Sequence, residues 1–161
     1  MIELIEKYVV DGFGNINLPE SEDEKRKLAR ALLGLSLIGN LDNWLNNAFD
    51  LIDNHEPEEP FLRENALSRK DKAFRLAFAH LDNAVKEKIK EIIIDTASGV
   101  LFSSLVTFDQ FEYGDICISL RPKTLDGKSE ALDISDKWED LHDELPEWIE
   151  NFSNYRKELK S

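Results

Sequence analysis

A carboxylate and an imidazole lie one helical turn apart near the end of the chain, in Glu139-Asp140-Leu141-His142. Side chains three residues apart in a helix share a face, which makes Glu139 and His142 weak candidates for metal ligands. Helical bundles that hold two metal ions use two such motifs and two further carboxylates. The chain holds one copy, in a segment rich in Asp and Glu. A solvated helix face is therefore the alternative to a metal site.

Two further groups carry reactive chemistry, and neither has the partners that a nucleophile or a base needs. Cys117 lies on the polar face of an expected strand, where the neighbouring Asp115 disfavours a thiolate. His80 stands between Ala79 and Leu81 and fits a helix at the edge of the core. The sequence therefore predicts no catalytic residue and no cofactor.

Two carboxylates flank a strongly apolar stretch. Asp95 follows three isoleucines, and Asp109 follows Val106-Thr107-Phe108. One interpretation places Asp95 on a solvated face and Asp109 in a turn that ends a helix. The other makes them buried partners of Arg69, Arg75 or Arg121.

Acidic residues gather at both ends of the chain. The 161 residues carry a net charge of −13, with 13 acidic against 5 basic side chains in 1–60 and 10 against 4 in 129–161. A single acidic face would attract a cationic partner, although a charge run can equally serve solubility alone. The candidate partner-binding residues are Glu56, Glu58, Glu59, Glu139, Asp140, Asp143 and Glu144. Nucleic-acid phosphate and anionic membranes are disfavoured because they bind basic surfaces.

Composition favours a soluble, cytoplasmic protein. One cysteine excludes an internal disulfide and is typical of a reducing compartment. The first six residues include Glu3 and Glu6, whereas a secretory signal needs positive charge in this region. The apolar-rich run 31–39 is about half the length of a membrane span, so no membrane contact is expected.

Apolar spacing predicts helices in the first third of the chain. A short helix covers residues 2–10, and a second begins after a capping box of Ser21 and Glu24. Gly39-Asn40 is expected to end that helix, and a third is expected from about Asp42, with Trp44 in its buried face. These two helices would form an antiparallel hairpin.

A long apolar stripe predicts a central helix over about 69–108, opened by a capping box of Ser68 and Asp71. Because this helix would be about 60 Å long, a break near Asp82-Asn83 or at Gly99 is expected. After Gly114 the apolar period changes to two, which predicts a small β-hairpin over about 115–134 with a turn at 123–129.

The C-terminal part is expected to be helical again. One helix starts at Ser135 or Asp136 and buries Trp138, and Pro146 begins a following helix that ends near Leu159. The predicted fold is therefore a single domain, 1–161, of the α+β class and dominated by helices. A two-stranded hairpin is marginal alone, so its edge is expected to pack on the helices or to pair with a second copy.

The stretch Ala84–Ile92, followed by Thr96–Asp109, resembles small uncharacterised bacterial cytosolic proteins of the toxin-immunity type. In that resemblance the helix ends in Leu-Asp-Gly before a strand, where this chain has Phe108-Asp109-Gln110, and a histidine often stands where Ala97-Ser98 are found here. The resemblance implies a helix-rich fold with a small β element and a toxin-neutralising role.

Three functions follow from these patterns. The leading one is a non-enzymatic acidic module that binds a basic protein, most concretely an immunity-type inhibitor of a basic toxin or nuclease. The second is a metal-dependent enzyme built around His142, Glu139 and a carboxylate such as Asp95. The third is a structural or oligomerisation module that uses the hairpin edge.

Overall fold

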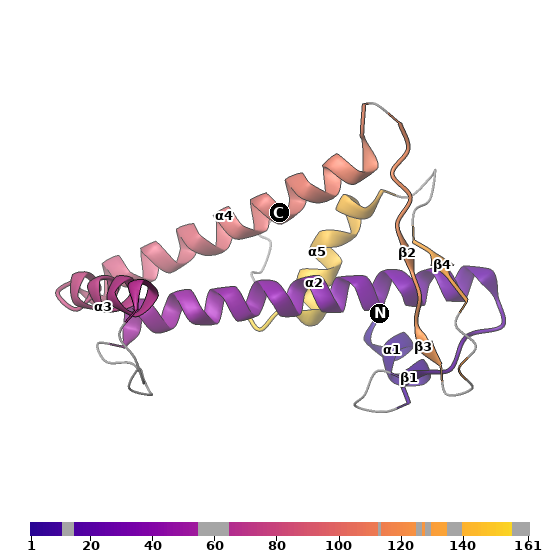
Figure 1. The fold of residues 1–161 in the computed structure, drawn as a ribbon, viewed down its shortest axis with the longest axis horizontal. Helices are drawn as coiled ribbons and strands as arrows, with labels where there is room; N and C mark the ends of the chain where they lie inside the picture. Colours follow the sequence, from indigo (N-terminus) through magenta and orange to yellow (C-terminus); the bar gives the residue numbers. More distant parts are fainter. Residues whose placement is uncertain are drawn as a thin grey trace. The chain divides into compact units, whose positions relative to one another are not determined.

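The computed structural model describes residues 1–10, 15–54, 65–112, 114–124, 127, 130–134 and 140–155. Along the chain the elements are α1 (Ile2–Tyr8), β1 (Asn15–Ile16), α2 (Glu22–Asp53), α3 (Ala66–Phe78), α4 (Asn83–Asp109), β2 (Ser119–Leu120), β3 (Lys123–Thr124), β4 (Leu132–Asp133) and α5 (Leu141–Phe152). Figure 1 shows that helices dominate and that the strands are short. The predicted α+β class with a helical majority is confirmed.

The chain forms two compact units, and the helices α2 and α4 each contribute to both. Unit 1 holds Met1–Asn40 and Leu101–Ser161, and unit 2 holds Leu41–Val100. The boundaries fall beside Gly39 and Gly99, the two glycines at which the sequence predicts helix breaks. The organisation of 1–161 as one domain stays a prediction.

The predicted helical hairpin in the first third of the chain is wrong, because α2 continues through Gly39 for 32 residues. Ala31, Ile38, Leu45 and Ile52 are all buried and lie seven residues apart, so one buried line runs through the glycine without a change of phase. A glycine inside a helix costs only about 1 kcal/mol, which burial on both sides offsets. Trp44, expected in the core, lies beside this line and is 75% exposed.

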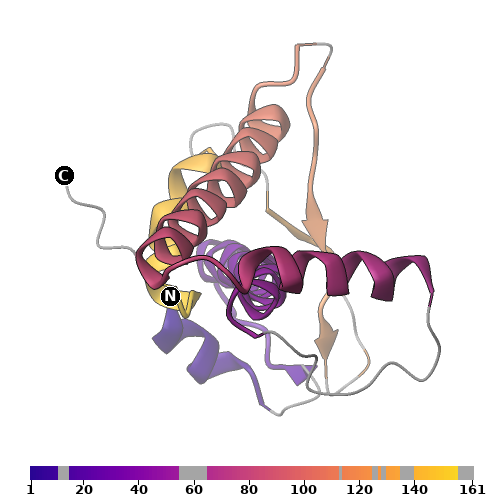
Figure 2. The same cartoon turned by 90° about the vertical axis from the view of Figure 1, so that its left-hand side faces the viewer.

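The predicted central helix is two helices, because α3 ends at Phe78 and α4 begins at Asn83 (Figure 2). The break agrees with the one expected near Asp82, whereas the start of α3 differs from the prediction. Asn65 caps α3, and Ser68 is the third residue of the helix. The backbone N–H of Asn65 donates to the Ser68 hydroxyl at 2.9 Å, and the backbone N–H of Ser68 donates to the Asn65 side-chain oxygen at 2.9 Å, which makes a capping box. The helix therefore begins at Ala66, three residues before the predicted start at about residue 69.

The apolar stripe of this region is largely exposed rather than buried. Ile92 and Val100 of α4 are 64% and 62% exposed, whereas Leu105 is buried. By length and composition α4 could cross a membrane: an 18-residue stretch has a mean hydropathy of 1.4, and 6% of it is buried. A single such helix is weak evidence. The segment that bears on membrane contact is therefore α4 rather than the run 31–39, and the absence of membrane contact stays a prediction.

The β structure of the described residues consists of two pairs of two-residue strands and one isolated bridge from Val9 to Ile16, all in unit 1. β2 and β4 pair antiparallel with Ser119 opposite Asp133, as the predicted hairpin requires. Side chains 115–121 alternate as expected, with Ile116, Ile118 and Leu120 less exposed than their neighbours. The region 123–129 is not only a turn, however, because β3 pairs parallel with β1, joining Lys123 to Asn15 in register.

Candidate functional site

The helix α5 carries the candidate site, and its two faces differ sharply in polarity. Leu141, Leu145 and Trp148 are buried at helical spacing, while Asp143 and Glu147 are exposed.

The helix α5 continues through Pro146, where a second helix was predicted to start. The proline removes the hydrogen bond from residue 146 to the carbonyl of His142 without ending the helix. α5 ends at Phe152 rather than near Leu159. The predicted start of the preceding helix at Ser135 or Asp136, with Trp138, lies outside the described residues.

Trp148 fixes α5 against the first half of α2. Its side chain is fully buried, and a Cβ placed on Gly34 would lie 2.5 Å from the indole ring. Only a residue without a side chain allows this close approach. Packing of Trp148 therefore sets where the acidic face of α5 lies relative to the α2 residues of unit 1.

His142 is held at the start of α5 by Asp109, the last residue of α4. The Asp109 carboxylate accepts a hydrogen bond from the backbone N–H of His142 at 2.9 Å and lies 2.8 Å from its Nδ1. The Phe102 ring packs edge-on against the imidazole of His142, with 5.3 Å between the two ring centroids. The hydrogen bond to Asp109 raises the pKa of His142 above 6.5, and partial burial opposes this.

Asp109 thus resolves the two interpretations of the carboxylates that flank the apolar stretch. Its side chain is 9% exposed and pairs with a histidine rather than with an arginine. Asp95 is exposed, as the solvated-face interpretation holds. The carboxylate that is hydrogen-bonded to His142 is therefore Asp109, where the enzyme hypothesis names a carboxylate such as Asp95.

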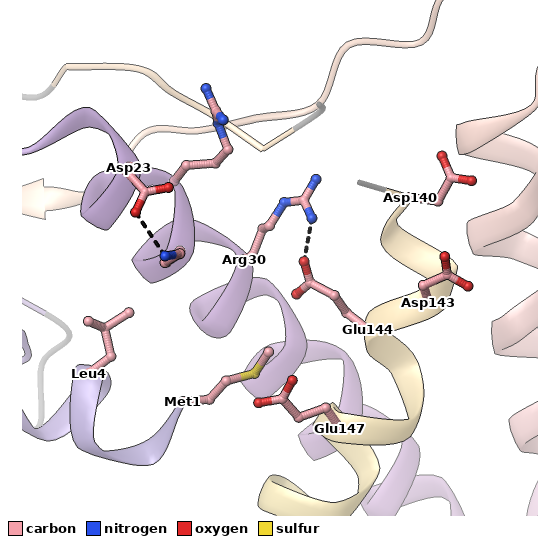
Figure 3. Close-up of a pocket in the computed structure, with 10 residues that line it drawn as sticks. Met1, Leu4, Asp23, Arg30, Asp140, Asp143, Glu144 and Glu147 are labelled. Carbon is pink, nitrogen blue, oxygen red and sulfur yellow. Dashed lines mark hydrogen bonds and ion pairs between the residues drawn. The ribbon is translucent and has the colours of Figure 1, made fainter. Parts of the chain in front are cut away.

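A cavity of about 590 Å³ opens between α1, α2 and α5 (Figure 3). The α5 side contributes four carboxylates, the α2 side contributes three cations and one carboxylate, and α1 contributes apolar surface. The lining residues are Asp140, Asp143, Glu144 and Glu147; Arg26, Lys27, Arg30 and Asp23; and Met1 and Leu4. Among the lining side chains that the structure describes, carboxylates outnumber cations by five to three, so these side chains carry an excess of negative charge.

Ion pairs within the cavity engage cations of α2. Lys27 pairs with Asp23 at 2.8 Å, and Arg30 pairs with Glu144. Arg30 is almost completely buried, and its Nε donates to the Ile134 carbonyl at 3.0 Å. Asp140 and Glu147 form no ion pair with a lysine or arginine in the described part of the chain. The excess negative charge therefore lies on the α5 wall, which consists of Asp140, Asp143, Glu144 and Glu147.

The structure brings together three of the predicted partner-binding residues. Asp140, Asp143 and Glu144 line the cavity, although Glu144 pairs with Arg30 and so has a structural role. Glu56, Glu58, Glu59 and Glu139 lie outside the described residues.

Sequence reasoning missed the α1 and α2 sides of the cavity. No local signal marks Arg30, because it stands between Ala29 and Ala31 like any solvated helical arginine. Glu147 belongs to the same acidic run as the predicted residues, and its position seven residues after Asp140 is the signal that could have included it.

Three potential metal ligands converge beside this cavity. Ligand atoms of Asp140, His142 and Asp143 lie within 4.8 Å of one another, and His142 Nε2 is 3.6 Å from an Asp143 oxygen. Of the two residues named from the sequence, His142 belongs to this group and Glu139 lies outside the described residues. Asp109 on Nδ1 leaves Nε2 as the nitrogen that faces the two carboxylates.

A second cavity of about 520 Å³ lies on the other side of Asp140, between the end of α4 and the segment 114–118. Cys117 lines it and is exposed, with Asp109, Asp115 and Asp133 in the same lining. The charged lining residues that the structure describes are all carboxylates, which do not favour a thiolate nucleophile.

No protein-family model, no curated protein and no solved structure matches the chain.

Proposed function

We propose that the protein is a small acidic binding module whose partner is a basic protein. The observation that carries this is the α5 wall, where Asp140, Asp143 and Glu147 line a cavity while the α2 cations Lys27 and Arg30 are already paired. The net charge of −13 adds long-range attraction for a cationic surface. The resemblance to toxin-immunity proteins supports a cytoplasmic inhibitor of a basic toxin or nuclease.

In this proposal the acidic flanks steer the partner, and α5 then occludes its basic active site. Steering by exposed charges acts on association, because counter-ions screen it beyond a distance of about 10 Å at 0.1 M salt. The association rate constant should therefore fall steeply with salt, while the dissociation rate changes little.

Stopped-flow association with a cationic nuclease tests the proposal. The triple variant D140N/D143N/E147Q should lower the association rate constant at low salt by roughly tenfold or more, within the range that steering supplies. The variant E3Q/E6Q/E112Q is the matched control, because it removes the same charge from three exposed carboxylates elsewhere. Equal losses in both variants, or association that does not depend on salt, would rule out the α5 wall as the binding face.

Binding of a divalent cation is a second candidate, favoured by the convergence of Asp140, His142 and Asp143 in front of Asp109. Imidazole with two carboxylates suits Zn²⁺, Mn²⁺ or Fe²⁺. Thermal melting with each metal should show stabilisation that His142→Ala abolishes and His80→Ala, in the exposed turn before α4, retains. The absence of any shift would eliminate this candidate.

A further inference from the structure

The helix α3 buries polar side chains and exposes apolar ones. Its two buried residues are Ser68 and Arg75. Leu67 and Leu76 are 68% and 57% exposed, and Phe74 is 41% exposed. A helix that packs only within its own fold normally turns its apolar side chains toward the core. The outward side of α3 therefore carries apolar surface that the rest of the fold leaves open.

Polar contacts on the buried side of α3 determine which side faces outward. Ser68 forms the capping box with Asn65, and Arg75 donates from Nη1 to the carbonyls of Asp50 and Asn54 at the end of α2. Asp50, Asn54 and all of α3 belong to unit 2. The apolar side of α3 is thus available while the helix stays attached to its own unit.

Three exposed cations lie on α3 beside this apolar surface. They are Arg69, Lys70 and Lys72, and the single carboxylate of the helix, Asp71, is half-buried. The Nζ of Lys70 lies 5.6 Å from the centroid of the Phe74 ring, so positive charge and apolar surface adjoin each other. This helix is therefore locally basic, although the whole chain carries a net charge of −13.

The charge of α3 distinguishes between the surfaces that could cover its apolar side. If α3 packed on the α3 of a second copy, the same three cations would face each other, and like charges across an interface repel. An anionic lipid surface complements the cations with phosphate groups and accepts leucine and phenylalanine side chains below them. A bilayer also adapts to the convex side of a helix, whereas a protein partner has to supply a matching groove.

The other two helices of unit 2 also expose large apolar side chains. Trp44 of α2 is 75% exposed, and Ile92 of α4 is 64% exposed. Tryptophan is enriched where proteins meet the interface between membrane and water. Apolar exposure on all three helices of one unit favours contact with an extended lipid surface over contact with one short peptide.

We propose that α3 binds an anionic membrane surface. Leu67 and Phe74, which lie two helical turns apart, enter the boundary between headgroups and acyl chains, while Arg69, Lys70 and Lys72 face lipid phosphates. The sequence-based expectation of no membrane contact rests on net charge. Salt screens charges beyond about 10 Å at 0.1 M, so the local charge of α3 governs its contact with a bilayer.

Co-flotation of the full chain with lipid vesicles tests the proposal. The protein should float with vesicles made of equal parts phosphatidylcholine and phosphatidylglycerol at low salt, and added salt should weaken this binding. It should not float with vesicles of phosphatidylcholine alone. The absence of flotation with the anionic vesicles, or equal flotation with both kinds, would overturn the proposal.

Charge variants show whether the cations of α3 carry the attraction. R69Q/K70Q should lower the partition coefficient onto anionic vesicles by roughly 20- to 30-fold, the usual contribution of two cations near such a surface. K7Q/R121Q is the matched control, because it removes one exposed lysine and one exposed arginine from unit 1. An equal loss in the control would show that general charge, rather than α3, causes binding.

Apolar variants test insertion with every charge intact. L67S/F74S should lower the partition coefficient by about tenfold or more, since burying even one such side chain contributes at least this much. I2S/V10S is the matched control, because Ile2 and Val10 are exposed apolar residues of unit 1. Circular dichroism checks that each variant is folded. Unchanged binding of folded L67S/F74S contradicts insertion of α3.

Two other occupants would give different results. If poly-L-glutamate binds and R69Q/K70Q abolishes this binding while vesicles do not bind, the surface recognises an acidic protein and the membrane proposal is wrong. If sedimentation shows a dimer that L67S/F74S dissociates, a second copy covers α3 and the proposal is again wrong. The acidic wall lies in unit 1, so association with a cationic nuclease is tested independently of flotation.

Discussion

At the scale of single residues, the start of α5 depends on a contact between two side chains that are 33 positions apart. Asp109 contacts both the backbone N–H and the ring Nδ1 of His142. It therefore satisfies an N–H of the first turn of α5 while holding the imidazole in place. A carboxylate at the end of one helix thus positions the acidic beginning of another.

The His142–Asp109 contact predicts how stability changes with pH. Because the pKa of His142 is raised above 6.5 in the folded protein, this pair stabilises it fully below about pH 6.5. That contribution is lost as pH rises through the folded-state pKa. NMR titration should give a His142 pKa above 6.5, and D109N should lower it. An unchanged His142 pKa in D109N would contradict the assigned cause.

Replacement by alanine should change stability in opposite directions at two glycines of α2, Gly34 and Gly39. Gly34→Ala places a Cβ 2.5 Å from the Trp148 ring and should destabilise the protein by roughly 1–3 kcal/mol, as overpacking does. Gly39→Ala meets no atom within 4 Å and should stabilise it by about 0.4–1 kcal/mol. Urea unfolding of both variants measures the difference. A destabilising Gly39→Ala would show that this position needs its glycine for another reason.

At the scale of elements, Arg75 of α3 caps the end of α2 within unit 2. Its Nη1 donates to the carbonyls of Asp50 and Asn54 at 3.1 and 3.0 Å, and its Nη2 pairs with the Asp50 carboxylate. The carbonyls at the end of a helix lack hydrogen-bond donors within the helix and carry partial negative charge. A buried guanidinium supplies N–H donors to these carbonyls and compensates their charge. One side chain thereby connects two helices.

This cap predicts acid sensitivity of unit 2. Hydrogen bonds from Arg75, and then from Asn54, lower the pKa of Asp50 below 3.8. The pair stabilises the fold above about pH 3.8, and that contribution is lost as pH falls through the lowered pKa. Arg75→Ala should cost about 1.5–3 kcal/mol at neutral pH, the usual value for hydrogen bonds to a charged group. Equal urea midpoints for the wild type and Arg75→Ala would disprove the cap.

At the scale of the whole molecule, the proposed binding wall and the most exposed large apolar side chains belong to different units. The acidic wall proposed to bind a partner belongs to unit 1, where Trp148 is fully buried. In unit 2, by contrast, Trp44, Leu67 and Ile92 each expose more than 60% of their surface. Large exposed apolar side chains, where they form a continuous patch, are typical of surfaces that contact something else.

The sequence by itself determined the class of the fold, the helical and strand periods, and the acidic character of the α5 segment. These follow from local spacing: Ile116, Ile118 and Leu120 alternate because a strand has period two, and Leu141, Leu145 and Trp148 recur because a helix has period 3.6. Helix ends were predicted less well. Gly39 and Pro146 are strong local breakers, yet burial on both sides of each kept α2 and α5 continuous.

Only the tertiary structure decided which charges meet. Asp109 contacts His142, Arg30 contacts Glu144, and Arg75 contacts Asp50 across separations of 33, 114 and 25 residues. No periodicity encodes such pairs, because an ion pair depends on distance in space and each of these side chains looks like a solvated helical residue in its local sequence. The acidic wall is accordingly a property of the sequence, and its position in a cavity opposite paired cations is a property of the fold.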